Sequence, residues 1–173
     1  HLILKKNNFR PTAIIIPRHI NKSKNIKKNC EKFNLKAQII SKNDIINPDN
    51  DIIIVNSYGL ISSYLELCKS VFIGKSTIKK MKDVGGQDPI EAAKSGCKIY
   101  HGPYVYNFYE IYKLLSKLNL SEEVKTEIHL AKKIYKDLKS LKNVKSKKIS
   151  IINNLGKKIL KDTCDELYKI IKK

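Results

Sequence analysis

Short, largely apolar runs rich in isoleucine recur along the first two-thirds of the chain. Their lengths suit strands, and the stretches between them carry apolar residues at helical spacing. We expect strands at Ala13–Ile16 (within Pro11–His19), Ala37–Ile40, Ile52–Val55, Val71–Ile73 and Lys98–Tyr100. Apolar runs that alternate with helices are typical of a parallel sheet covered on both faces. The sequence therefore predicts an α/β fold.

Helical spacing of apolar residues is clearest before the second strand, after the third, and near the C-terminus. We expect helices at Ser23–Asn34 (with Ser23 as N-cap), Leu60–Lys69, Thr126–Leu141 and Lys147–Ile171, with Lys139–Lys148 as the linker between the last two. The chain has 173 residues, the length of one domain with a real core. The expected organisation is a core over residues 1–120 and two C-terminal helices, residues 121–173, that pack on the same domain.

The chain is strongly basic, with a net charge of +19 from 35 lysines and arginines against 16 acidic residues. Only Arg10 and Arg18 are arginines. Proteins that read nucleic-acid sequence rely on arginine forks and aromatic stacking, whereas these lysines fall at polar positions of helical patterns. We therefore expect no nucleic-acid binding, but an attraction to an anionic membrane surface, which needs only the summed charge.

Composition and run lengths exclude further classes of protein. Apolar residues make up 42% of the chain, too many for a disordered polycation. The longest apolar runs, Ala13–Pro17 and Ile52–Val55, are far shorter than a bilayer span of about 20 residues, and no signal-peptide pattern is present. We expect a soluble chain and, because it begins with His1 rather than Met, a piece of a longer protein.

The cysteines are Cys30, Cys68, Cys97 and Cys164, which are widely separated and have no histidine pair nearby. This spacing does not favour a zinc site or a disulfide framework. We expect four buried thiols in a reducing cytosol, with no metal and no cofactor.

Six of the seven glycines lie between residues 59 and 102. Glycine permits positive φ and close approach of two backbones, so this clustering predicts tight turns between strands and helices. In open α/β sheets, ligands bind at such turns, at the carboxyl ends of the strands. Three of these segments carry candidate binding residues.

The first segment is Pro17-Arg18-His19, at the end of the first expected strand. Arg18 can bind a phosphate or carboxylate through two parallel hydrogen bonds, and a surface ion pair is the alternative. The second segment is Asn56–Gly59, which leads into a helix whose free N–H groups attract an anion. Asn and Ser before a helix are more often simple helix caps than ligand contacts.

The third segment is Gly85–Glu91. We expect Asp88 as the N-cap of a helix, Pro89 at its first position and Glu91 at its third, which is the spacing of a capping box. Glu91 can alternatively accept hydrogen bonds from two hydroxyls of a ribose. The helix is expected to end at the glycine of Ser95-Gly96.

The motifs occur in the order Ile-Ile-Ile-Pro-Arg-His, Asn-Ser-Tyr-Gly, Val-Phe-Ile-Gly-Lys-Ser, Gly-Gly-Gln-Asp-Pro-Ile-Glu-Ala-Ala and His-Gly-Pro-Tyr-Val-Tyr-Asn-Phe. Over roughly residues 1–118, this succession resembles the C-terminal half of the 3-deoxy-D-manno-octulosonic acid (Kdo) transferases, glycosyltransferases of the GT-B fold. The resemblance implies a Rossmann-like parallel sheet with flanking helices.

The resemblance also implies a function. Family members transfer Kdo from CMP-Kdo to a lipid A precursor in lipopolysaccharide synthesis, without a metal, at the cytoplasmic face of the inner membrane. The residues implied in donor binding are Pro17, Arg18, Tyr58, Gly59, Leu60, Asp88, Pro89, Ile90 and Glu91. Arg18 and the Tyr58–Leu60 turn are implied for the phosphate and the Kdo carboxylate, and Glu91 for the ribose.

Four positions depart from the family pattern. Leu60 stands where Glu is usual, Asn56 where Asp is usual, Gln87 where His is usual, and Asp88 where Asn is usual. A carboxylate at Asp88 would repel an anionic donor unless its role is to cap the helix. The resemblance further implies that the general base, the acceptor site and the membrane anchor belong to an N-terminal half, and that the first strand of this half precedes His1. We therefore expect no transferase activity from residues 1–173 alone.

Two alternatives remain open. Another GT-B enzyme with a different nucleotide sugar would show a similar Glu91 and a similar Gly85-Gly86 turn. A non-catalytic basic module that binds RNA or membrane would instead show a steep dependence on salt and no preference for a nucleotide.

Overall fold

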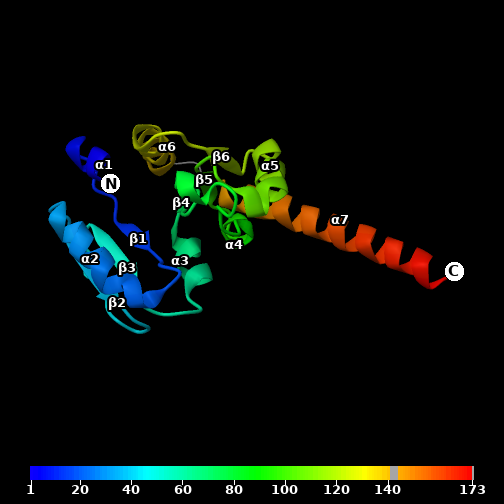
Figure 1. The fold of residues 1–173 in the computed structure, drawn as a ribbon, viewed down its shortest axis with the longest axis horizontal. Helices are drawn as coiled ribbons and strands as arrows, with labels where there is room; N and C mark the ends of the chain where they lie inside the picture. Colours follow the sequence, from blue (N-terminus) through cyan, green and yellow to red (C-terminus); the bar gives the residue numbers. More distant parts are fainter. Residues whose placement is uncertain (141–143, 173) are drawn as a thin grey trace.

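The computed structural model describes residues 1–140 and 144–172 of the chain. Its described strands are all parallel and form two sheets of three strands (Figure 1). The five expected strands are present as β1 (Ala13–Ile15), β2 (Ala37–Ile40), β3 (Ile52–Val55), β4 (Ser70–Ile73) and β5 (Lys98–His101). The prediction of a Rossmann-like α/β fold with parallel strands and flanking helices is confirmed.

The first sheet has the order β1-β3-β2, so β3 lies in its centre. All four residues of β3 are buried, because both faces of the sheet are covered. On one face Ile52 and Ile54 pack in a cluster with Leu35 of the chain that follows α2 (Ser23–Lys32). On the other face Ile53 and Val55 form a second cluster with residues near α3 (Ile61–Leu67).

The second sheet has the order β4-β5-β6. Its third strand, β6 (Ser121–Glu123), is missing from the sequence prediction, because its residues Ser-Glu-Glu carry no strand signal. The residues directly before and after β6, Leu120 and Val124, are almost completely buried and anchor the strand in the core. The sheet therefore extends beyond residue 120.

Seven helices surround the sheets in the described chain (Figure 1). Their bounds are α1 (Leu2–Lys6), α2 (Ser23–Lys32), α3 (Ile61–Leu67), α4 (Ile90–Lys94), α5 (Tyr109–Lys117), α6 (Glu127–Lys139) and α7 (Lys145–Ile171), with short 3-10 helices η1 (Ile20–Lys22), η2 (Lys79–Met81) and η3 (Tyr106–Phe108). α6 contacts β4, and α1 packs on α6. Residues 141–143 of the expected linker, and the last residue of the expected helix Thr126–Leu141, lie outside the described residues.

One expected helix cap is wrong. Ser23 is the first residue of α2 and not its N-cap, because η1 leads directly into the helix and Lys22 takes the N-cap position. The Ser23 hydroxyl is buried and has no hydrogen-bond partner in the described chain. The expected helix end is confirmed, since Gly96 follows α4 with a φ of 71°.

α7 has two different halves. Its first half packs on α4 and contributes the buried Ile152 to the core of the second sheet. Its second half extends away from both sheets (Figure 1). The large apolar residues exposed there are Ile159, Leu160, Leu167, Tyr168, Ile170 and Ile171. No helix in the described part of the chain is both long enough and apolar enough to cross a bilayer.

The cysteines are free, but the prediction of four buried thiols is wrong. Only Cys97 is buried, and this burial raises the pKa of its thiol to about 11. Cys30 and Cys68 are half-buried. Cys164 is exposed because it lies on the projecting half of α7.

Candidate ligand-binding site at the strand ends

The first predicted segment follows β1. Ile16 packs on the cluster of Ile40, Ile53 and Val55, and this contact fixes the chain just before Pro17. Arg18 is exposed, and in the described chain its guanidinium forms neither a hydrogen bond nor an ion pair. The surface ion pair that was the alternative is therefore not formed, and the guanidinium is available to a ligand.

The second predicted segment follows β3. Gly59 has a φ of 78° and open space around its Cα, so glycine is needed there for its backbone conformation and not for lack of room. The side chain of Leu60 packs on the cluster that also holds Ile16, which leaves only its backbone for a ligand. Because Ile16 and Leu60 share this cluster, the first two segments lie at the same end of the first sheet.

The polar residues before Gly59 hold the neighbouring backbone. Asn56 donates its backbone N–H to Ile40 O at 2.7 Å, and the Ser57 hydroxyl accepts a hydrogen bond from the backbone N–H of Lys42 at 3.0 Å. Within the described residues, no side chain caps α3. Asn56 and Ser57 therefore fix the ends of β2 and β3, while the exposed Tyr58 extends from the turn.

The third predicted segment begins α4. A carboxylate oxygen of Asp88 accepts a hydrogen bond from the backbone N–H of Ile90 at 2.8 Å, but the expected N-cap is wrong by one residue, because Pro89 takes the N-cap position of α4 and Glu91 is its second residue. Pro89 is buried. The reciprocal half of the capping box is not formed, because Glu91 is exposed and its carboxylate has no hydrogen bond in the described chain. The Glu91 carboxylate is thus available to a ligand, and the Asp88 carboxylate is occupied.

The loops after β4 and β5 are tied together by hydrogen bonds, and we call residues 74–77, 84–89 and 101–107 the glycine loop unit. Its central residue is the fully buried Ser76, whose hydroxyl donates to Ile73 O at 2.7 Å and accepts from the backbone N–H of Gly102 at 2.9 Å. Tyr104 N–H donates to Ser76 O at 2.8 Å, and Gly86 N–H to Lys75 O at 3.2 Å.

Two glycines of this unit are required by close contacts. A Cβ on Gly102 would lie 2.4 Å from Ser76 O, and a Cβ on Gly85 would lie 2.5 Å from Tyr104 O. Both neighbours are backbone atoms, which cannot move without moving the loops. The expected function of these glycines, close backbone approach, is therefore observed.

Two buried aromatic residues support this unit from α5 and β5, and neither is among the site residues predicted from the sequence. Tyr112 donates its hydroxyl to Gln87 O at 2.9 Å, and its ring lies 4.3 Å from the ring of His101. His101 Nδ1 lies 2.7 Å from Gly102 O, which fits an N–H on that nitrogen. Burial lowers the pKa of His101. The pKa of Tyr112 is raised, mainly by burial and to a smaller extent by the negative charge of Asp88.

A pocket of about 640 Å³ lies between α3, α4 and α7 and is lined by one residue of the predicted segments, Glu91. Glu91 lines it together with Ser62, which belongs to the first turn of α3. Lys145 of α7 bounds the pocket and donates its ammonium hydrogens to Leu65 O and Glu66 O, at the end of α3. The structure therefore brings Glu91 and the start of α3 together, while no hydrogen bond in the described chain joins Arg18 to either.

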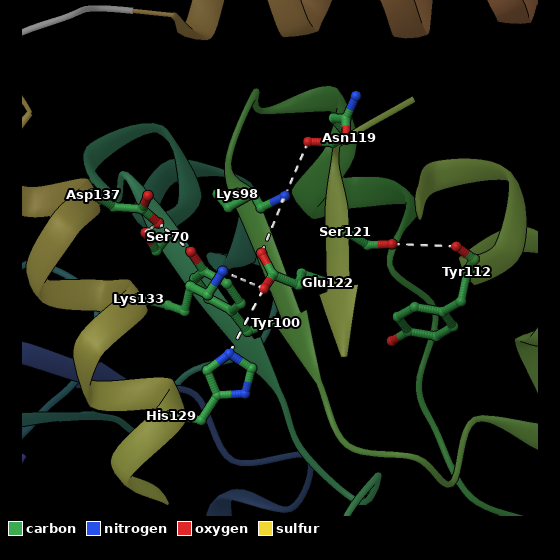
Figure 2. A network of polar contacts seen from close by, with 10 residues as sticks. All are labelled: Ser70, Lys98, Tyr100, Tyr112, Asn119, Ser121, Glu122, His129, Lys133 and Asp137. Carbon is green, nitrogen blue, oxygen red and sulfur yellow. Dashed lines mark hydrogen bonds and ion pairs between the residues drawn. The ribbon is translucent and has the colours of Figure 1, made fainter. Parts of the chain in front are cut away.

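A separate polar network fastens α6 to the second sheet (Figure 2). Ser70 and Tyr100 both donate their hydroxyls to the Asp137 carboxylate, at 2.6 and 2.7 Å. Beside Asp137, the Glu122 carboxylate forms ion pairs with a lysine of β5 and a lysine of α6. Burial alone would raise the pKa of Glu122, but these lysines hold this pKa below its ordinary value. Ser70 is the first residue of β4, at the amino end of the strand. The network is therefore structural and lies apart from the predicted segments.

Comparison with curated sequences and with solved structures finds proteins similar to this chain, whereas comparison with family models does not. A search of protein families finds none that matches the chain. A 3-deoxy-D-manno-octulosonic acid transferase of Rickettsia prowazekii is 30% identical over 174 residues, which cover 98% of this chain and 36% of the relative. The enzyme of the same name from Aquifex aeolicus is 25% identical over 142 residues, which cover 82% of this chain and 38% of the relative. The chain thus spans little more than a third of the length of these relatives.

Among solved structures, the fold resembles the C-terminal CMP-Kdo binding domain of WaaA from Acinetobacter baumannii. The TM-score is 0.75 at 18% sequence identity, and the alignment covers 88% of this chain and 78% of the other. Fold and strand-end segments together define a Rossmann-like α/β domain. With the relatives above, the chain is related to the Kdo transferases and corresponds to their C-terminal half.

Proposed function

We propose that this domain binds CMP-Kdo, and that the longer protein to which it corresponds transfers Kdo to a lipid A precursor. The observation that carries the proposal is the arrangement of the three predicted segments. All follow carboxyl ends of parallel strands, and Glu91 shares a pocket with the first turn of α3. The carboxyl ends of the strands are the place where open α/β sheets bind nucleotides.

Each residue has a proposed role in holding the donor. The free Arg18 guanidinium binds the phosphate or the Kdo carboxylate, because its planar fork matches both groups. The Glu91 carboxylate accepts hydrogen bonds from the ribose hydroxyls. Tyr58, Gly59 and Leu60 offer backbone groups at the start of α3. Pro17, Pro89 and Ile90 shape the two loops. The Asp88 carboxylate holds the backbone N–H of Ile90, which offsets part of the conflict between its charge and an anionic donor.

In the transfer reaction a hydroxyl of the acceptor attacks the anomeric carbon of Kdo, and CMP leaves. The proposed part of this domain is to stabilise the charge that grows on the phosphate of the leaving CMP, through Arg18. The general base and the acceptor site are proposed to lie in the N-terminal half of the longer protein, which acts at the cytoplasmic face of the inner membrane. The chain of residues 1–173 is then a donor-binding piece without activity of its own.

The two sheets have free edges that suit such a longer protein. Among the described strands, β1 pairs only with β3, and β4 pairs only with β5. A further strand before residue 1, as the family resemblance implies, is proposed to pair with these edges and so to join the two sheets into one.

Calorimetric titration with CMP, UDP and GDP tests the proposal. We expect CMP to bind most tightly, and Glu91→Gln to weaken CMP binding by about 1 kcal/mol through loss of a charge-assisted hydrogen bond. The control is Glu110→Gln, an exposed glutamate of α5, which should leave the affinity unchanged. A preference for UDP or GDP would support another GT-B enzyme, and no nucleotide preference would reject the donor site.

An assay of Kdo transfer separates binding from catalysis. Residues 1–173 should bind CMP and yet transfer no Kdo to a lipid A precursor. Transfer by this chain alone would contradict the proposed division of roles between the two halves.

A further inference from the structure

A basic and apolar surface overlaps the edge of the glycine loop unit and contains none of the residues proposed to hold the donor. It consists of the loop between β4 and α4, residues 75–84, together with Tyr106 and Tyr109, and we call it the lysine–tyrosine surface. We propose that this surface binds a lipid bilayer that carries anionic lipids. The inference rests on the membrane location in the proposed function and names the surface responsible, but its test does not depend on donor binding.

The charge of the loop is concentrated and uncompensated. Residues 75–84 contain Lys75, Lys79, Lys80 and Lys82 against the single acidic residue Asp83. In the described chain none of these four lysines forms an ion pair. The last three are exposed and lie in η2 or directly after it. Anionic lipid headgroups attract such a cluster.

Large apolar side chains are exposed among these lysines. Ile78 and Val84 flank η2 and are 49% and 51% exposed, and Tyr106 and Tyr109 are 68% and 57% exposed. Lys113 lies over the Tyr109 ring, 5.6 Å from its centroid. Tyrosines and aliphatic residues bordered by lysines are typical of protein surfaces that rest at the boundary between headgroups and acyl chains.

Hydrogen bonds hold the two parts of the surface side by side. The side-chain amide of Asn107 donates to Val84 O at 3.2 Å, and its backbone N–H donates to Gly85 O at 3.4 Å. The loop itself is closed by Met81 N–H donating to Ile78 O at 2.9 Å and by Val84 N–H donating to Met81 O at 3.1 Å. The apolar residues are therefore presented together, with little conformational entropy left to lose on binding.

Other lysine-rich parts of the chain fit a bilayer less well. The exposed lysines of α2, namely Lys24, Lys28 and Lys32, have only Phe33 as an exposed large apolar neighbour. The second half of α7 does expose apolar residues, but Asp162, Asp165 and Glu166 offset its lysines. Its apolar stripe also continues the face that packs on α4 through Ile149 and Ile152, as in helices that contact protein. Charge and exposure therefore favour the lysine–tyrosine surface.

Vesicle sedimentation with the chain of residues 1–173 tests the inference. One set of vesicles is pure phosphatidylcholine, and the other is equal parts phosphatidylcholine and phosphatidylglycerol. We expect binding to the anionic vesicles only, weakened by salt. The triple variant Lys79→Gln, Lys80→Gln, Lys82→Gln should lower the partition coefficient by about tenfold to 100-fold, from the attraction of three lysines near a charged surface.

A matched control removes the same charge elsewhere. The triple variant Lys24→Gln, Lys28→Gln, Lys32→Gln on α2 should bind anionic vesicles within about twofold of the unchanged chain if the surface and not the net charge is responsible. The double variant Ile78→Ser, Val84→Ser keeps every charge and should also weaken binding severalfold. Circular dichroism and thermal unfolding confirm that each variant folds.

Three results would overturn the inference. They are unchanged vesicle binding by the loop lysine variant, an equal loss in the α2 control, and unchanged binding by Ile78→Ser, Val84→Ser. Tighter binding to single-stranded RNA than to anionic vesicles, with no effect of that apolar variant, would assign the surface to nucleic acid instead. CMP titration of the same samples shows separately whether the donor site is intact.

Discussion

The loops after β4 and β5 differ sharply from the loops after β1 and β3, although both sets contribute to the proposed donor site. The first set is the glycine loop unit, in which the buried Ser76 and two close-packed glycines fix the backbone. In the second set Arg18 and Tyr58 are exposed, and Gly59 has open space around it. The glycine loop unit is thus fixed by contacts within the fold. In the loops after β1 and β3, the exposed side chains are left to be ordered by a ligand.

This difference bears on how the two sides contribute to affinity. The hydrogen-bonded loops that precede α4 place the backbone of Glu91, although its exposed side chain must still be ordered by a ligand. The Arg18 side chain must be ordered by the ligand, and this cost offsets part of the strong interaction of a guanidinium with a phosphate. Substitutions in the first set should therefore act mainly on stability, and those in the second set mainly on binding.

The largest effect is expected from Gly102→Ala. The new Cβ would lie 2.4 Å from Ser76 O, and overpacking of this kind costs about 2 to 3 kcal/mol in the free energy of unfolding. Gly74→Ala is the matched control in the same loop unit, because nothing lies within 4 Å of its added Cβ, and it should change stability by less than about 0.5 kcal/mol. Urea unfolding measures both, and equal effects would contradict the rigidity of the unit.

Arg18→Ala tests the open side. We expect the affinity for CMP to fall by about 1.5 to 3 kcal/mol, the range for a hydrogen bond to a charged group, with no change in the free energy of unfolding. Arg10→Ala removes the other arginine of the chain and should leave CMP binding unchanged. If calorimetry finds equal affinities for the Arg18 variant and the unchanged chain, Arg18 is not part of the site.

Strands and turns that carry their own signal could be predicted from the sequence, and this covers most of the fold. The isoleucine runs correctly predict the bounds of β2 and β3, and the clustered glycines correctly predict the loops that pack closely on one another. The carboxylate of Asp88 does bond to a backbone N–H at the start of α4, although Pro89 and not Asp88 takes the N-cap position. In each case the residues concerned bear the physical cause themselves, as β-branching, free φ or a side-chain acceptor.

Features whose cause lies elsewhere in the chain could not be predicted. β6 is a strand because β5 offers hydrogen bonds and because Leu120 and Val124 are buried, not because of its own three residues. Tyr112 fits an ordinary apolar stripe of α5, and its bond to Gln87 O depends on a contact across 25 residues. The exposure of Cys164 follows from the projection of α7.

Tyr112→Phe sharpens the comparison by removing a single support of the rigid side. Loss of its hydrogen bond to Gln87 O should lower the free energy of unfolding by about 1 kcal/mol. CMP binding should weaken slightly as well, because the Gln87 carbonyl immediately precedes the loop residues that position Glu91. Tyr109→Phe, on the exposed face of the same helix, should change neither quantity. Urea unfolding and CMP titration of both variants check this, and equal values for the two would show that the bond does not hold the loop.

The smallest effect is a dependence of stability on pH that arises from the rigid side alone. Burial lowers the pKa of His101 below its ordinary value of 6.5, so the unfolded chain takes up a proton at a higher pH than the folded chain. The contribution of His101 to stability is therefore complete above pH 6.5 and is lost as the pH falls through the folded pKa, with a slope below about 1.4 kcal/mol per pH unit.

Comparison of slopes separates this effect from any general loss of stability. His101→Gln should reduce the slope of unfolding free energy between neutral and mildly acidic pH, whatever its own stability. His19→Gln, in the exposed loop after β1, should run parallel to the unchanged chain. If the two variants show the same slope, the buried histidine does not distinguish the rigid loops from the open ones, and the contrast between the two sides of the site is then one of packing and not of electrostatics.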